Sequence, residues 1–311
     1  MKALGDDPLL PLAGLRVGIS GAVPEREFWG STADLDCRIL SAVSRLSGFV
    51  MEYGGTIVHG SQPALAPVIA EQARDVGDVE GRLTGKATRP NPLLLVGSQL
   101  WGYFPKVTAQ AARRAVATVV LTPKLGPGDE TDPPTRDASL TGMRLVMAGQ
   151  VDVLVAIGGK LHRDTGFNQG VLEQLAIMRW HGIPCFVVAC FGGAAANLEW
   201  TMLHRFSDGN LLSESEVGQI AAWSEAQDDA VGILLAHFAR HRDAFGTRRE
   251  AAPVRQVRFH PAQQLPELAS GRIAEIDPAL VEDTSKRFGE LKQAVDKADS
   301  ARVGELLKVA V

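Results

Sequence analysis

The sequence has few of the residues that build covalent or metal-bound frameworks. Its only cysteines are Cys37, Cys185 and Cys190, too few and too unevenly spaced for a disulfide framework or a CxxC metal site. Cys185 and Cys190 flank an apolar run, so we expect buried, reduced thiols and a cytoplasmic protein. His237 and His241 form an HxxxH pair that lacks the glutamate of HExxH. We therefore predict no metal site, and nothing in the sequence points to a cofactor.

Long apolar runs and a basic excess are also lacking. No run reaches the ~20 residues of a membrane-spanning helix, and the N-terminus has acidic residues and prolines where a signal peptide needs a basic start. We therefore expect a soluble protein with no membrane partner. Lys and Arg total 32 against 36 Asp and Glu, and aromatic residues make up 6%. Without a basic field or a basic aromatic stripe, binding to nucleic acid is disfavoured.

The alternation of apolar runs predicts the fold. Short runs rich in Val, Ile and Leu alternate with longer segments of helical periodicity, which is typical of an α/β protein whose sheet is covered on both faces. We predict a doubly wound, mostly parallel, Rossmann-like sheet with an appended C-terminal helical extension. Helices are expected at 34–53 and 171–180. Strands are expected at 15–20, 56–58, 93–96, 117–121, 153–157 and 185–189.

The remaining segments suggest a division near residue 250. Stretches 78–91 and 124–137 are rich in turn residues and are predicted to be exposed loops. A long helix is predicted at 213–245, then an extended linker or edge strand at 251–266, and a final amphipathic helix at 278–309. We assign residues 1–250 to an α/β domain and 251–311 to the linker and extension. The apolar stripes of these helices suit either docking on the domain itself or an interface. We expect a homo-oligomer, or a partner protein at the C-terminal helices.

Glycine is the residue in excess, with 32 copies in 311 residues, against a usual share of roughly 7%. Clusters of it follow four of the predicted strands, and parallel α/β sheets bind ligands beyond the carboxyl ends of their strands. Glycine lets backbone N–H groups approach a phosphate, and the next helix N-terminus adds partial positive charge. The candidate ligand-binding residues are Gly18, Ser20, Gly21, Gly60, Ser61, Gln62, Gly158, Gly159, Lys160, Gly170, Val171, Glu173, Gly192 and Gly193.

Each cluster alone is explained better by a tight turn between a strand and a helix than by a ligand site. Known fingerprints do not decide the matter, because the first strand is followed by no GxGxxG and the chain contains no GxxxxGK[ST] and no GxSxG. Ordinary Rossmann dehydrogenases, P-loop NTPases and serine hydrolases of the GxSxG type are therefore disfavoured. The consistent position of the four clusters favours a nucleotide-phosphate site.

Three charged residues lie near these turns. Lys160 follows a double glycine and is a candidate phosphate counter-charge, although a solvated loop lysine explains it too. Arg144 lies about two helical turns before the strand at 153–157 and either reaches the same edge or stays on a helix surface. Glu173 either contacts a ribose or glycosidic bond or complements the dipole of its helix.

Four segments of the chain form a recognisable set, namely LRVGISGAVPE, YGGTIVHGSQPALAPVIAE, MRLVMAGQVDVLVAIGG and GVLEQ. Together they resemble the SLOG superfamily, which joins Lonely-Guy-type phosphoribohydrolases, Smf proteins and the ligand-sensing domains of TRPM-type channels and prokaryotic conflict systems. The second segment is similar to the G-G-x-I-V-x-G-G-H-P pattern of sensor-type members. The resemblance covers about residues 15 to 200, and it implies a nucleotide-type ligand such as an ADP-ribose relative, a cyclic nucleotide or a nucleoside monophosphate.

The enzymatic branch of the superfamily carries PGGxGTxxE and an upstream arginine, which Arg144 matches to within one position. Here IGGK is followed by LHRDTGFNQ before GVLEQ, and the family's catalytic glutamate falls on Gln174, with Glu173 one residue early. An amide cannot act as a general base. The main hypothesis is therefore a nucleotide sensor. The alternative is a nucleotide N-glycosidase, a phosphoribohydrolase or deoxyribosyltransferase-like enzyme, using Arg144 and Glu173. DNA binding of the Smf kind is disfavoured by the acidic net charge.

Overall fold

The structure is a computed structural model. It describes residues 10–24, 33–77, 81, 90–101, 110–112, 115, 117–162, 168–197, 211–222, 229–251, 258–261 and 270–308. Of the predicted loop at 78–91, only residues 81, 90 and 91 are described, so this prediction lies largely outside the described part of the chain.

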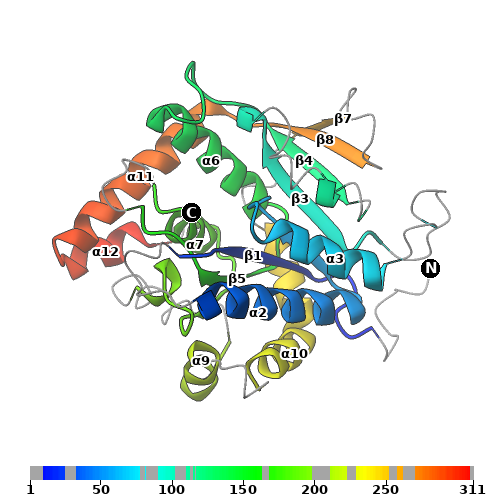
Figure 1. Cartoon of the computed structure of the whole chain (residues 1–311). Coiled ribbons are helices and arrows are strands. Elements are labelled where there is room, and N and C mark those ends of the chain that lie inside the picture. The colour runs from blue at the N-terminus through cyan, green and yellow to red at the C-terminus, as the bar shows by residue number, and fades with distance from the viewer. Residues whose placement is uncertain are drawn as a thin grey trace.

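One open sheet organises the fold (Figure 1). The strand order is β6-β5-β1-β2-β3-β4-β8-β7, and every neighbouring pair is parallel except β7 with β8. This arrangement confirms the predicted α/β, Rossmann-like class and all six predicted strands. The strands are β1 (Arg16–Ala22), β2 (Thr56–His59), β3 (Leu93–Ser98), β4 (Thr118–Thr122), β5 (Val153–Gly158), β6 (Cys185–Val188), β7 (Arg258–Pro261) and β8 (Ser270–Glu275).

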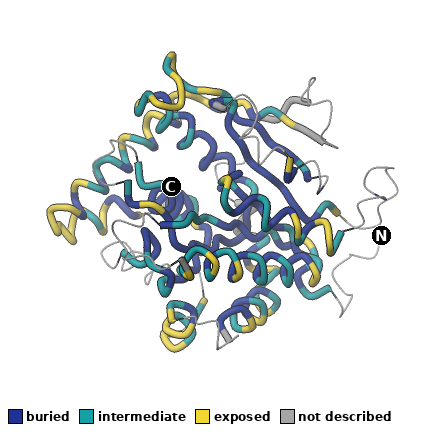
Figure 2. The backbone as a smooth tube through the Cα atoms, in the orientation of Figure 1, coloured by how far each residue is buried: buried dark blue, intermediate teal, exposed yellow. Residues whose placement is uncertain are grey.

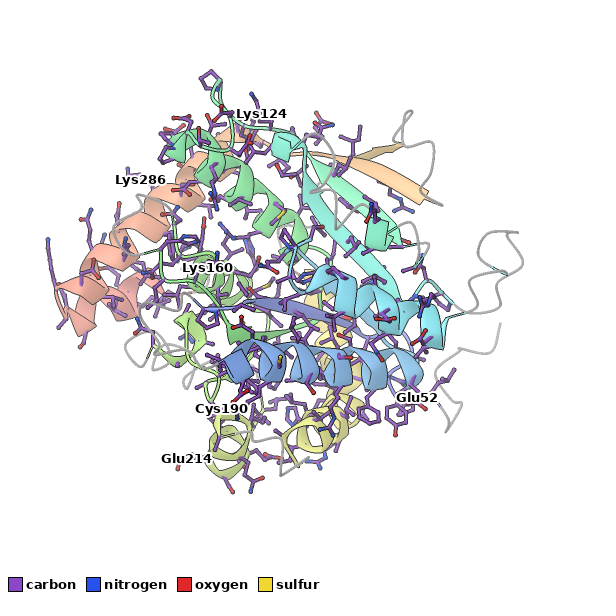
Figure 3. The ribbon with its side chains drawn as sticks, in the orientation of Figure 1. Glu52, Lys124, Lys160, Cys190, Glu214 and Lys286 are labelled. Atoms are coloured by element: carbon purple, nitrogen blue, oxygen red, sulfur yellow. The ribbon has the colours of Figure 1, made fainter. Side chains whose placement is uncertain are left out.

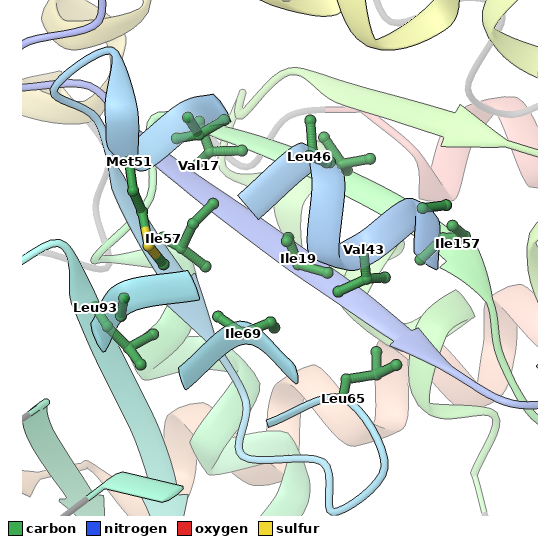
Figure 4. Close-up of a cluster of buried hydrophobic side chains, with 14 of the residues drawn as sticks. Val17, Ile19, Val43, Leu46, Met51, Ile57, Leu65, Ile69, Leu93 and Ile157 are labelled. Carbon is green, nitrogen blue, oxygen red and sulfur yellow. The ribbon is translucent and has the colours of Figure 1, made fainter. Parts of the chain in front are cut away.

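Helices cover both faces of the sheet. Alternate residues of β5 show this, since Val153 and Val155 point into one core and Leu154 and Ala156 into the other. The first core lies under α2 (Ala33–Glu52), α3 (Ala66–Val76) and α10 (Asp229–Ala251), and Figure 4 shows part of it. The second lies under α6 (Pro133–Ala148), α7 (Gly170–Trp180), α11 (Pro278–Asp296) and α12 (Ser300–Leu306). Dark blue segments in Figure 2 mark the buried strands and inner helices.

Two long helix predictions were wrong about continuity. In place of one helix over 213–245, α9 (Glu214–Ala221) ends before α10 begins at Asp229. In place of one helix over 278–309, α11 and α12 form a hairpin. Ala298 adopts a positive φ of 53°, and Asp299 accepts a hydrogen bond from the Arg302 N–H at 3.0 Å as the cap of α12. The apolar stripe continues across this turn, so the periodicity of the sequence gave no sign that the helix is interrupted.

The loop predicted at 124–137 was also partly wrong, because α6 begins at Pro133. Asp132 caps it by accepting from the Thr135 N–H at 3.2 Å, and proline suits the first turn since it has no N–H to satisfy. The acidic and proline residues that indicate a turn are thus the start of the helix.

The chain beyond residue 250 contributes to the same sheet. The edge strand predicted within 251–266 is present as β7, whereas β8 was missed because SGRIAE has no strong alternation. β8 pairs with β4, and Phe288 and Leu291 of α11 join the second core. The division into 1–250 and 251–311 stays a prediction. Within the described residues, no helix is long and apolar enough to cross a membrane.

Candidate functional site

A cavity of about 520 Å³ lies at the carboxyl ends of β1, β2 and β3, between α6 and the start of α7. Ordinary small-molecule sites have volumes of roughly 300–1,000 Å³. Its described lining comprises Ile19, Ser20, Gly21, Ala22, His59, Gly60, Ser61, Gln62, Pro63, Ala64, Gly97, Ser98, Arg136, Leu140, Met143, Arg144, Met147, Lys160, His162, Gly170, Val171 and Gln174. Figure 3 places Lys160 near the carboxyl end of β1.

Many of the sequence-predicted site residues meet at this cavity. Those that line it are Ser20, Gly21, Gly60, Ser61, Gln62, Arg144, Lys160, Gly170 and Val171. Those that do not are Gly18, Gly158, Gly159, Glu173, Gly192 and Gly193. The first two glycine clusters therefore contribute directly to the cavity, the third contributes through Lys160 and Gly170, and the glycines of the fourth are not part of the lining.

The glycines outside the lining permit close contacts within the fold. A Cβ on Gly18 would lie 2.8 Å from the Cδ1 of Leu154, its pairing partner on β5, so this glycine leaves room for that side chain on the face of the sheet. Gly159 and Gly193 have φ values of 99° and 68°, which favour glycine. A Cβ on Gly193 would lie 2.4 Å from the Gly159 carbonyl oxygen. At these two glycines the turns after β5 and β6 therefore pack against each other.

The turn after β2 is fixed by its own polar side chains. Ser61 has a φ of 60°, which is uncommon for serine, and its hydroxyl donates to the Val96 carbonyl at 2.7 Å. The Gln62 side-chain oxygen accepts from the Ala64 N–H at 2.7 Å and the Leu65 N–H at 3.0 Å, ahead of α3. Because these side chains hold the turn to β3 and α3, the turn is rigid before any ligand arrives.

His59 joins the end of β2 to β1. Its Nδ1 lies 3.0 Å from the Ile19 carbonyl oxygen, which can only accept, so Nδ1 carries the proton. Burial lowers the pKa of His59, opposed by the carbonyls of Ile19 and Gln62. A neutral imidazole therefore lies in the cavity wall.

The charged side chains of the lining are all cationic. They are Arg136, Arg144 and Lys160, and among the described lining residues none is an aspartate or a glutamate. Burial lowers the pKa of Arg136, with Asp137 opposing that effect and Arg144 adding to it. Two guanidiniums and an ammonium around one cavity favour an anionic ligand, and guanidiniums bind phosphate through paired hydrogen bonds.

Glu173 and Gln174 take opposite positions. Gln174 lines the cavity, and its side-chain nitrogen donates to the Arg144 carbonyl at 3.3 Å. Glu173 is fully buried behind the wall, where it accepts hydrogen bonds from Arg144 and from the Thr141 hydroxyl. Burial raises the pKa of Glu173, while Arg144 and Thr141 oppose the rise. The side chain that faces the cavity at this position is thus a neutral amide.

Several lining residues were missed from sequence. Arg136, Leu140, Met143 and Met147 lie on one face of α6 with Arg144. Their spacing of three and four residues is a helical signal. It was obscured because the first of them was assigned to a loop. His59 and Ser98 are the last residues of β2 and β3, and only the sheet order reveals that they adjoin the same cavity.

The fold and cavity define an α/β protein with a cationic site at the carboxyl edge of a parallel sheet. Residues 123–228 match the family model described as SLOG cluster2, a span that runs from the end of β4 through β5, α7 and β6. This match supports membership of the SLOG superfamily. No curated protein matches the chain.

Proposed function

We propose that this protein binds a nucleotide or nucleotide-derived anion, such as an ADP-ribose relative, a cyclic nucleotide or a nucleoside monophosphate, and acts as a sensor rather than an enzyme. The observation that carries the proposal is the charge of the cavity. Arg136, Arg144 and Lys160 line it, and its described lining has no carboxylate. A dianionic phosphate in such a site gains charge-assisted hydrogen bonds that a neutral ligand cannot form.

The backbone supports the same class of ligand. The cavity lies at the carboxyl edge of a parallel sheet, beside glycine turns and the N-terminus of α7 at Gly170. Backbone N–H groups and the helix dipole favour negative charge at this place. The phosphate subsite of the proposal lies here, between the turn at Gly60–Ser61 and the start of α7.

The remaining wall suits the uncharged part of a nucleotide. Leu140, Met143, Met147 and Val171 line the cavity beside the cations. Methionine is flexible and polarisable, and it forms favourable contacts with aromatic rings. We assign the base to this apolar wall and the sugar to the space between it and the phosphate subsite.

The alternative activity, N-glycosidic cleavage, has one supporting observation, the pairing of Arg144 with Glu173 directly behind the wall. Against it, both carboxylate oxygens of Glu173 already accept hydrogen bonds within the fold, and Gln174 holds the cavity-facing position. Cleavage would require Glu173 to leave these donors. The sensor proposal needs no such change.

Titration calorimetry with AMP, 3′,5′-cyclic AMP, ADP-ribose and NAD tests the proposal. After each titration, chromatography of the solution from the calorimeter shows whether the nucleotide is still intact. We expect at least one to bind and to be recovered intact. Failure of all four to bind would overturn the proposed function. Release of a free base that is lost in Glu173→Gln would establish the glycosidase instead.

A further inference from the structure

We propose that Ser285, Thr141 and Glu173 are positioning residues that couple anion binding at Arg144 to the docking of the C-terminal hairpin α11–α12. The proposal rests on the proposed function, since it concerns the regulation of the same cavity. It assigns a role to the segment after residue 277, which contributes no residue to the described lining.

A chain of side-chain hydrogen bonds runs from α11 to the cavity. The Ser285 hydroxyl lies 3.3 Å from the Thr141 hydroxyl oxygen on α6. Thr141 donates to one oxygen of Glu173 on α7, and Arg144 donates to the other. Because the carboxylate only accepts, Thr141 must donate to it, and Ser285 in turn donates to Thr141. All donors therefore point toward Glu173, an arrangement in which each hydrogen bond polarises the next.

Burial makes this chain sensitive to Arg144. Thr141 and Glu173 are fully buried, and Arg144 has 7% of its surface exposed, where it meets the cavity. A charge at this depth depends strongly on its partner, because the low dielectric gives no other compensation. Any change in the bond from Arg144 to Glu173 therefore alters how strongly Glu173 holds Thr141.

Arg144 has donors left for a ligand. Its Nη1 bonds to Glu173, while its Nη2 faces Gly170, where an added Cβ would lie 2.8 Å away. Gly170 lines the cavity at the start of α7, so the absence of a side chain there leaves the guanidinium open toward that space. A planar guanidinium with five donors can serve two anions at once. A bound phosphate would thus share Arg144 with Glu173.

The hairpin is attached to α7 at a second place. Trp180 on α7 donates from Nε1 to the Leu306 carbonyl at 2.9 Å, and the Arg287 guanidinium of α11 stacks 4.5 Å from the Trp180 ring. Arg287 also donates to the Leu306 carbonyl at 2.9 Å. A shift between α6 and α7 at Arg144–Glu173 therefore reaches both contacts of the hairpin. Sites that share such an element are coupled in both directions.

The test combines calorimetry with hydrogen exchange on the full chain, using AMP and ADP-ribose as probes. We expect Ser285→Ala and Thr141→Val to raise the Kd of the bound probe by about 2- to 10-fold. The variant Thr141→Ser keeps the hydroxyl and should bind the probe with the Kd of the wild type. Ser300→Ala removes a hydroxyl from α12 that takes no part in this chain of hydrogen bonds, so it should leave the Kd unchanged. In wild-type protein the probe should slow amide exchange in residues 278–308, and Ser285→Ala should reduce that protection.

The outcomes separate the two proposals. The coupling would be overturned if Ser285→Ala and Thr141→Val bind a probe with the wild-type Kd and the probe does not change amide exchange in residues 278–308. The proposed function would then still stand. Absence of any binding to wild-type protein would overturn the proposed function, and the coupling would fall with it. Equal loss of affinity in Thr141→Val and Thr141→Ser would also contradict the coupling, since the serine keeps the hydroxyl.

Discussion

At the scale of single residues, the adjacent side chains of Glu173 and Gln174 have different roles. Glu173 is buried in an ion pair, whereas Gln174 lines the cavity. Adjacent residues of a helix lie on different faces of it. A carboxylate at position 173 therefore lies in the core, whereas one at position 174 would line the cavity. The glutamate thus supports Arg144, and the cavity keeps its net positive lining.

Lys160 offers the simplest residue-scale test of the anion site. Lys160→Ala is expected to weaken binding of the nucleotide found by calorimetry by about 1–2 kcal/mol, because one charge-assisted hydrogen bond is lost. Lys160 is exposed, so the free energy of unfolding should change little. Lys286→Ala on α11 is the matched control, since it removes the same charge from an exposed residue that does not line the cavity. Equal effects of the two variants would show that Lys160 acts only through overall charge.

The buried pair predicts a particular pattern of stability. Arg144→Ala should lower the free energy of unfolding by about 3–5 kcal/mol, because Glu173 is then buried without its cation. Arg144→Ala combined with Glu173→Gln should recover part of that loss, since the neutral amide is less costly to bury. Urea unfolding of the two variants and wild type measures this. A double variant no more stable than Arg144→Ala would contradict the account.

At the scale of elements, the cavity is built where strands end and helices begin. The turn after β2 is pinned to β3 by Ser61, and α6 presents its apolar and cationic face along one wall. The same helix buries Val146 against the second core, so the position of Arg144 is set by hydrophobic contacts. A site on a helix packed in this way stays ordered when the ligand is absent.

The docking of α11 can be measured directly. Phe288 is fully buried in the second core, and Phe288→Ala should cost about 3–5 kcal/mol of stability through lost burial and the cavity that remains. Leu280→Ala, at an exposed position of the same helix, should cost far less. Thermal or urea unfolding compares the two. A small effect of Phe288→Ala would mean that α11 does not belong to the core.

Sequence patterns predicted the strands β1 to β6 and the glycine turns, since runs such as DVLVAIGG are strongly apolar and end sharply. They failed at β8, whose pairing with β4 follows from tertiary context, and at the start of α6, whose capping residues look like a loop. The pairing of Glu173 with Arg144 was also hidden, because it depends on how α6 and α7 pack. Local sequence patterns were therefore sufficient to predict most helices and strands. The side chains that meet at the site depend on contacts between distant elements, which local patterns do not reveal.

At the scale of the whole molecule, buried neutral histidines link stability to pH. Burial lowers the pKa of His181 from 6.5 to about 4, with Arg287 adding to the effect. As pH falls below 6.5 the unfolded chain takes up a proton at His181, whereas the folded chain does not until about pH 4. Stability is therefore full above 6.5 and falls through this window, by at most about 1.4 kcal/mol per pH unit for one group.

His181→Gln tests this linkage. Its free energy of unfolding should fall less than that of wild type between pH 7 and pH 5, because the substituted side chain does not titrate. Groups common to both proteins cancel in the difference. Urea unfolding at the two pH values provides the measurement, and parallel losses in both proteins would exclude His181 as a contributor.

The most direct test of the central claim is a crystal structure of the protein with the nucleotide that calorimetry identifies. We predict density for an intact nucleotide in the cavity, with its phosphate contacting Arg144 and Lys160 beside Gly60, and its base against Met143 and Met147. A nucleotide bound elsewhere on the molecule, or one in this cavity with its phosphate directed away from the three cations, would contradict the account.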